Sequence, residues 1–99
     1  YKSGLSPSQL KLVIEYINEH LDEDLSLNEL STLTQISPHY FSQLFKQATG
    51  VPPHKYVINC RVNRAKELLQ KGESISQVAQ QVGFANQSHL NLHFVRQFG

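Results

Sequence analysis

Residues 25–50 read LSLNELSTLTQISPHYFSQLFKQATG and residues 73–99 read ESISQVAQQVGFANQSHLNLHFVRQFG, and the two segments share one pattern. The shared positions are apolar, small or glycine: Leu27, Leu30 and Ser31 match Ile75, Val78 and Ala79 at an offset of 48, and Phe41, Phe45 and Gly50 match Leu90, Phe94 and Gly99 at an offset of 49. Each copy predicts a short amphipathic helix, a tight turn and a longer helix that ends at glycine, which is a helix-turn-helix. Two such copies predict a protein that contacts DNA in two places.

Capping residues mark the predicted helix starts. Three serines precede Gln or Glu by three residues, as in a capping box: Ser6 with Gln9, Ser26 with Glu29, and Ser74 with Gln77. Ser37-Pro38 and Asn86 supply two more starts, because Pro is tolerated at the first helical position and Asn is a favoured cap. Pro52-Pro53 opens the longest predicted helix, and Gly72 ends it.

Apolar spacing predicts an all-α fold with six helices. The first helix, about 7–21, carries one apolar stripe: Leu10, Val13, Ile14, Ile17 and Leu21. A connector helix, about 53–71, carries a second stripe flanked by Val57 and Leu68: Ile58, Val62, Ala65 and Leu69. Since no segment alternates with period two, no sheet is expected. The prediction is one domain over 1–99, with helix-turn-helix subdomains at about 7–50 and 74–99 joined by the connector.

Length, composition and charge narrow the class of protein. A chain of 99 residues can bury one helical core, and no apolar run approaches the roughly 20 residues of a membrane span. No signal peptide is evident, and the single Cys60 fits a reducing cytosol, so a cytoplasmic location is expected. Residues 1–30 carry two Lys against six acidic residues, a charge of −4, whereas residues 31–99 carry seven Lys or Arg against two Glu, a charge of +5. The basic part suits contact with phosphates, although ordinary surface charge is an equally simple explanation.

The longer helices of the two copies, about 38–49 and 87–98, are the predicted reading helices. Their expected core sides are apolar: Phe41, Leu44, Phe45 and Ala48 in the first, and Leu90, Phe94 and Phe98 in the second. At 100° per residue, the opposite sides hold polar residues with little charge. These outward residues are candidates for contact with base edges in the major groove.

The candidate roles follow from the hydrogen-bonding capacity of each side chain. Gln43, Gln87 and Asn91 are the leading base readers, because an amide can pair bidentately with adenine. The other base-reading candidates can add single hydrogen bonds, or apolar contact in the case of the leucine: His39, Ser42, Ser88, His89 and Leu92. The candidates for phosphate contact are cations and helix N-terminal residues: Ser37, Pro38, Lys46, Lys55, Asn86 and Arg96.

Other functions remain as alternatives. A Gln-rich face is also the ordinary solvated face of a surface helix, and the low net charge suits a helical protein-interaction module. His89 and His93 have the spacing of a metal-binding pair, but no third ligand is evident, so neither a metal nor another cofactor is expected. His93 is instead expected to pack beside the core, and His89 is expected to face DNA. Cys60 is expected to be a buried free thiol, and no catalytic motif is present. Arg61 is expected to contact neighbouring helices rather than phosphates.

Three parts of the chain carry a resemblance to a known family. They are residues 37–57 (SPHYFSQLFKQATGVPPHKYV), residues 61–69 (RVNRAKELL) with Ile75-Ser76-Gln77-Val78-Ala79, and residues 83–99 (GFANQSHLNLHFVRQFG). From about Leu5 to Gly99, the chain resembles the DNA-binding domain of the AraC/XylS family of bacterial transcription regulators. The resemblance implies two helix-turn-helix subdomains joined by a long helix, with the reading helices in successive major grooves on one face of double-stranded DNA.

The resemblance also implies partners and some departures. It implies RNA polymerase as a partner of the full-length protein, and an effector ligand bound by a further N-terminal domain. The family often has a small residue and a Gly or Asn in the first turn, where this chain has Ser31 and Gln35. It commonly has Arg at the positions of Gln43 and Leu92. Because Arg is the side chain best suited to guanine, an A/T-richer site or a less discriminating second helix is expected.

Overall fold

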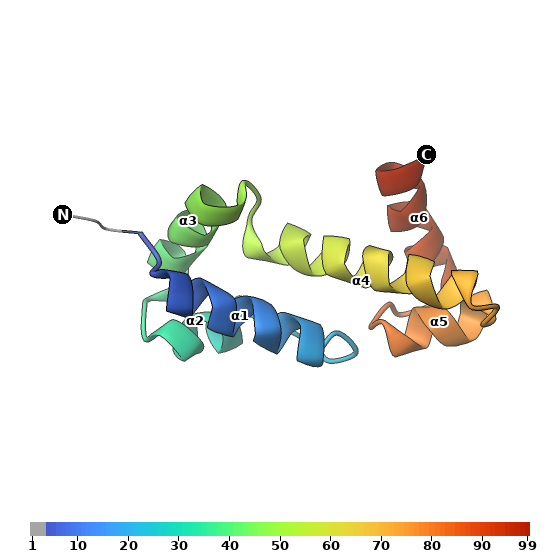
Figure 1. The fold of residues 1–99 in the computed structure, drawn as a ribbon, viewed down its shortest axis with the longest axis horizontal. Helices are drawn as coiled ribbons and strands as arrows, with labels where there is room; N and C mark the ends of the chain where they lie inside the picture. The colour runs from blue at the N-terminus through green and yellow to red at the C-terminus, as the bar shows by residue number, and fades with distance from the viewer. Residues whose placement is uncertain (1–3) are drawn as a thin grey trace. The chain divides into compact units, whose positions relative to one another are not determined.

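A computed structural model of the chain describes residues 4–99. In this range there are six helices and no strand (Figure 1): α1 (Pro7–Glu19), α2 (Leu27–Thr34), α3 (Pro38–Thr49), α4 (Pro53–Gln70), α5 (Ile75–Gln81) and α6 (Gln87–Phe98). The predicted all-α class and the helices expected at about 38–49 and 87–98 are therefore confirmed. α1 ends earlier than predicted, because His20 leaves the helical conformation and caps it with its backbone N–H. Among the described residues, no helix has both the length and the apolar character needed to cross a membrane.

The described residues pack as two units. Unit 1 comprises residues 4–20 and Leu25–Tyr56, and unit 2 comprises Leu21–Asp24 and Val57–Gly99. The first turn of α4 thus belongs to unit 1 and the rest of α4 to unit 2. The short segment Leu21–Asp24 joins α1 to α2 in the chain, yet it packs with unit 2.

Unit 1 is a three-helix arrangement in which α2 contacts both α1 and α3. Its core combines the α1 stripe with the apolar side of α3; the buried hydrophobic residues are Val13, Ile17, Leu30, Phe41, Leu44 and Phe45. Phe45 packs against Phe41 at a centroid distance of 5.7 Å and edge-on against Tyr56 at 5.3 Å. This packing fixes which side of α3 faces outward.

Unit 2 has its own apolar core beneath α6. The buried residues come from α4, from α5 and from the turn and helix that follow: Val62, Ala65, Leu68, Val78, Ala79, Val82, Phe84 and Leu90. The sequence predicted Ile58 and Leu69 in the apolar stripe of the connector helix and Leu68 beside it. In the structure Leu68 is buried, whereas Ile58 and Leu69 are only partly buried at the margin of this core. The buried side of α4 is therefore rotated slightly about the helix axis from its predicted position.

Two residues expected in the core are exposed. Ala48 lies in the last turn of α3, and its side of the helix is open to solvent at that point. Phe98 is the last residue of α6 and is 39% exposed. Its ring contacts Phe94 at 4.8 Å and lies 4.6 Å below Lys66 Nζ, so it packs beside α4 rather than in the core. Helical spacing predicts which side of a helix faces the core. It does not predict where along the helix the neighbouring element ends and the core stops.

The three predicted serine caps form, but among the described residues the reciprocal bond of the capping box is present at α1 and not at α2 or α5. At α1 the full box is present, because Ser6 Oγ accepts from Gln9 N and Gln9 Oε1 accepts from Ser6 N. The hydroxyls of Ser26 and Ser74 also cap α2 and α5. At α2 the Glu29 carboxylate was expected to complete the capping box with Ser26. It instead accepts a hydrogen bond from the Tyr16 hydroxyl of α1. The sequence predicted the cap but not this competing partner.

The turn between α2 and α3 contains a strained residue. Gln35 has φ 59° and ψ 29°, and it is the one non-glycine residue in the described range with a positive φ. In this left-handed conformation, a residue with a side chain destabilises the folded state by about 1–2 kcal/mol. Glycine avoids that cost, but its greater conformational entropy in the unfolded chain lowers the free energy of unfolding by about 0.4–1 kcal/mol. We therefore expect Gln35→Gly to stabilise the protein by roughly 0.5–1 kcal/mol, measured as a higher urea midpoint at unchanged m-value.

Gln47 provides a matched control for this prediction. It is exposed on α3, in the same unit, and has helical geometry. Gln47→Gly should destabilise the protein by about 1 kcal/mol, because glycine is unfavourable inside a helix. If both substitutions lowered the midpoint, the strain attributed to Gln35 would be wrong.

Candidate nucleic-acid interface

The first candidate surface is the outward side of α3. His39, Gln43 and Lys46 are exposed there, and Ser42 is half-buried. The Gln43 amide nitrogen lies 3.4 Å from His39 Nε2, so these two side chains, one turn apart, can form a continuous polar surface. Unit 1 therefore brings its predicted base-reading residues together on one helix.

The residues of unit 1 that are predicted to contact phosphate lie at the ends of α3 and at the start of α4. Ser37 and Pro38 are exposed at the N-terminus of α3, and the Ser37 hydroxyl makes no capping bond to the helix. The first turn of a helix has N–H groups without intrahelical acceptors and a partial positive charge, which favours anions. Lys46 in the last turn of α3 and Lys55 in the first turn of α4 add two exposed cations.

The second candidate surface is the outward side of α6. Asn86 caps this helix by accepting the His89 backbone N–H at 2.9 Å, which leaves its amide nitrogen to donate elsewhere. The predicted base-reading residues of α6 and the predicted phosphate contact in its last turn are all exposed: Gln87, Ser88, His89, Asn91, Leu92 and Arg96. Unit 2 therefore also presents its predicted base-reading residues on one helix.

Two histidines of α6 pack around one aromatic ring. His93 stacks on Phe84 at 5.6 Å, and His89 lies edge-on to the same ring at 5.3 Å. Partial burial lowers the pKa of His93, and the neighbouring His89 and Arg96 lower it further. His93 thus packs beside the core, as predicted, whereas His89 is exposed. Within residues 4–99 no group of three or more potential ligands could hold a metal ion.

Arg61 has a structural role, as predicted, but through different partners. Its Nε donates to the Leu21 carbonyl at 2.9 Å, and its Nη2 donates to the Glu23 carbonyl at 2.6 Å. The carboxylate of Glu67, six residues further along α4, pairs with exposed Arg64 at 3.1 Å. Cys60 is half-buried rather than fully in the core, and desolvation raises the pKa of its thiol.

The sequence reasoning missed one residue of the α6 surface. Val95 is 62% exposed, the highest value among the exposed large hydrophobic residues of the described range. Val95 follows Leu92 by three positions in the sequence, so both lie on the same side of α6. The 49-residue offset between the copies could have found Val95, because it aligns this residue with Lys46.

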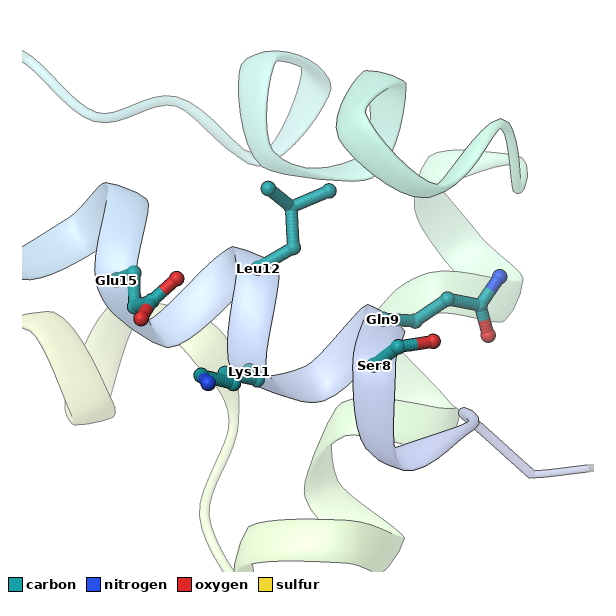
Figure 2. A pocket seen from close by; sticks show the side chains of 5 residues that line it. All are labelled: Ser8, Gln9, Lys11, Leu12 and Glu15. Atoms are coloured by element: carbon teal, nitrogen blue, oxygen red, sulfur yellow. The ribbon is translucent and has the colours of Figure 1, made fainter.

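The pocket in Figure 2 offers no comparable site. It has a volume of about 450 Å³ and is lined by Ser8, Gln9, Lys11, Leu12 and Glu15, all from α1. In this view Leu12 points to a different side of α1 from Ser8 and Gln9, and it is the single large apolar side chain among the five. Ligand sites bury most of the ligand between several elements, so this surface of α1 is not assigned a ligand.

Comparison with known proteins shows the family to which the chain is related. A family described as "Helix-turn-helix domain" matches residues 30–99. The probable transcriptional regulator LumQ of Photobacterium leiognathi is 38% identical over 89 residues, which are 89% of this chain and 36% of LumQ. The regulatory protein PocR of Salmonella typhimurium is 36% identical over 83 residues, 83% of this chain and 27% of PocR. The chain spans roughly a third of the length of the curated relatives it matches.

Solved structures extend the similarity to the fold. The DNA-binding domain of AdpA, a global transcriptional factor whose crystal structure is a complex with a target DNA, is 33% identical with a TM-score of 0.85. The similarity covers 92% of this chain and 83% of that domain. A transcriptional regulator of Chromobacterium violaceum with an AraC-type DNA-binding domain has a TM-score of 0.85 at 29% identity, over 92% of this chain and 82% of that one.

Proposed function

The chain belongs to the AraC/XylS family of helix-turn-helix domains, and we propose that it binds double-stranded DNA sequence-specifically as part of a bacterial transcription regulator. One observation supports this function most directly. Each unit presents a capped helix of 12 residues whose core side is buried and whose outward side is polar and exposed. Such a helix fits the major groove, where base pairs differ in their hydrogen-bonding groups.

We assign base reading to α3 and α6 and phosphate contact to their ends. Gln43 in unit 1, and Gln87 and Asn91 in unit 2, supply the amides that pair with adenine, and the exposed residues around them add single contacts. Lys46, Lys55 and Arg96, with the helix N-termini at Ser37, Pro38 and Asn86, hold the DNA backbone. Successive major grooves lie about 34 Å apart, so the proposed site has two boxes about one helical turn apart.

The wider roles of the full-length protein follow from this proposal. Named relatives are transcriptional regulators, so we infer action on DNA in the cytoplasm without a catalytic step. RNA polymerase is the proposed partner in transcription, and a domain outside these 99 residues is proposed to bind the effector. A helical protein-interaction module is the less favoured function, because a similar domain has been crystallised on its target DNA.

Selection of bound duplexes from a random pool tests the proposed function. We expect recovery of a site with two short boxes about one turn apart, and an affinity that falls steeply with salt because bound phosphates release counterions. Recovery of a single box would show that one helix alone reads sequence. No enrichment together with a flat salt response would reject DNA binding in favour of the interaction module.

Gln43→Ala tests base reading by α3. Loss of a bidentate contact should weaken binding to the selected site by about 1–3 kcal/mol and leave random-sequence binding nearly unchanged, as measured by competition titration. Lys46→Ala is the contrasting variant, because losing one phosphate contact should weaken both kinds of binding and reduce the salt slope by about 1. Equal losses on both DNAs for Gln43→Ala would mean that Gln43 does not read a base.

A further inference from the structure

The two reading helices share one register but carry different chemistry. α3 and α6 both have 12 residues and end at a glycine cap, and Phe41 and Leu90 occupy the same position as fully buried core residues. The same offset of 49 places Leu92 where α3 has Gln43, and Val95 where α3 has Lys46. Where unit 1 presents an amide and a cation, unit 2 presents two aliphatic side chains.

These two side chains are solvent-exposed rather than part of the core. Leu92 is 48% exposed and Val95 is 62% exposed, whereas Leu90 of the same helix is fully buried. Their spacing of three residues makes them neighbours on the helix surface, where they form a small apolar strip. Isolated apolar residues are common on protein surfaces, but here two adjoin at the centre of the proposed DNA-contacting side.

The residues around the apolar strip favour DNA as the molecule that binds there. Ser88 and Asn91 lie beside it on the exposed side of α6, and Arg96 follows Val95 in the last turn. A polar frame with a cation complements a polyanion better than it complements an apolar protein surface. Among the four bases, thymine alone carries an apolar group in the major groove, the C5-methyl.

We propose that Leu92 and Val95 recognise thymine C5-methyl groups in the box bound by unit 2. The two units then read DNA by different means: α3 by hydrogen bonds from Gln43 and α6 by apolar contact at the corresponding positions. Specificity in the second box then depends on the positions of methyl groups as well as on the amide contacts assigned to Gln87 and Asn91. This inference rests on the proposed function, because it needs a selected site with two boxes.

Replacement of thymine by deoxyuridine tests the inference, since the change removes the methyl and keeps every hydrogen-bonding group. Starting from the selected duplex, each thymine of the second box is replaced singly and the affinity is measured by titration. We expect at least one position at which the wild-type domain binds about fourfold more weakly, the loss for burying about one carbon less. In the variant Leu92→Ala/Val95→Ala, the ratio of thymine to deoxyuridine affinity at that position should fall to about one.

Leu12→Ala provides the matched control. Leu12 is a leucine of nearly the same exposure, 46%, but it lies on α1 in unit 1. This variant should keep the fourfold ratio, as should Leu92→Met, which retains an apolar side chain of similar size. Circular dichroism checks that all the variants keep their helices, as expected for exposed positions.

The outcomes separate this inference from the proposed function. Failure to recover any site would reject the proposed function itself. A two-box site in which no deoxyuridine of the second box weakens wild-type binding would overturn methyl recognition alone. A loss that persists in Leu92→Ala/Val95→Ala would also overturn it, because another group would then contact the methyl. Unchanged DNA affinity in that double variant would reassign the strip to a protein partner.

Discussion

Replacing Gly83 with alanine should destabilise unit 2 by about 3–5 kcal/mol, enough to unfold much of a small domain. Gly83 lies in the turn between α5 and α6 with a φ of +93°, where an L side chain costs about 1–2 kcal/mol. An added Cβ would lie 2.2 Å from the Leu21 carbonyl oxygen and 2.8 Å from Arg61 Nε. Relief of that contact would force the backbone apart and break the hydrogen bond between those two groups. Urea denaturation followed by circular dichroism measures the loss.

Gly72→Ala separates backbone strain from steric overlap. Gly72 has nearly the same φ, +92°, but an added Cβ would meet nothing within 4 Å. Only the conformational cost of about 1–2 kcal/mol is then expected. The difference between the two variants reports the contact with Leu21 and Arg61. Equal losses would show that residues 21–24 can move away freely, in contradiction to the structure.

The sequence predicted the fold well because each helix carries local signals. Caps such as Ser6 and Asn86, and stops such as Gly50, act within a few residues of the helix ends they determine. The residues of α3 and α6 could be divided into core and outward sides because a helix repeats every 3.6 residues. The sequence pattern also distinguished exposed His89 from half-buried His93.

The missed features depend on contacts between distant parts of the chain. Nothing around residues 21–24 indicates that this connection packs in unit 2, because its partners, Arg61 and Gly83, are about 40 and 60 residues away. Phe98 was predicted buried because spacing cannot show that the core ends before the last turn of α6. Val95 was overlooked because a β-branched aliphatic residue in a helix is ordinarily assigned to the core.

Removing the Arg61 side chain should give the second large effect, a loss of about 2–3 kcal/mol in the free energy of unfolding. The guanidinium donates to two backbone carbonyls of the Leu21–Asp24 segment, and hydrogen bonds from a charged donor contribute about 1.5–3 kcal/mol. Partial burial lowers the pKa of Arg61, an effect that nearby Asp24 and Asp22 oppose. Leu21 is a buried residue, and in Arg61→Ala its backbone carbonyl would lose the hydrogen-bond donor that Arg61 Nε provides.

Arg64→Ala is the matched control, since it removes the same charge three residues along α4. Arg64 is exposed and pairs with the exposed Glu67 carboxylate, a surface interaction of about 0–1 kcal/mol. Arg61→Lys should recover only part of the loss, because an ammonium group lacks the planar fork that reaches two acceptors. Equal unfolding midpoints for Arg61→Ala and Arg64→Ala would refute the structural role of Arg61.

Hydrogen exchange identifies where the Arg61 effect acts. Residues 21–24 pack in unit 2, so Arg61→Ala should speed amide exchange in this segment and around Gly83 before it affects α3. Arg61 lies in α4, outside α3 and α6, so its replacement removes no proposed base-reading side chain. Uniform exchange across all six helices would instead indicate global destabilisation without a local role for these hydrogen bonds.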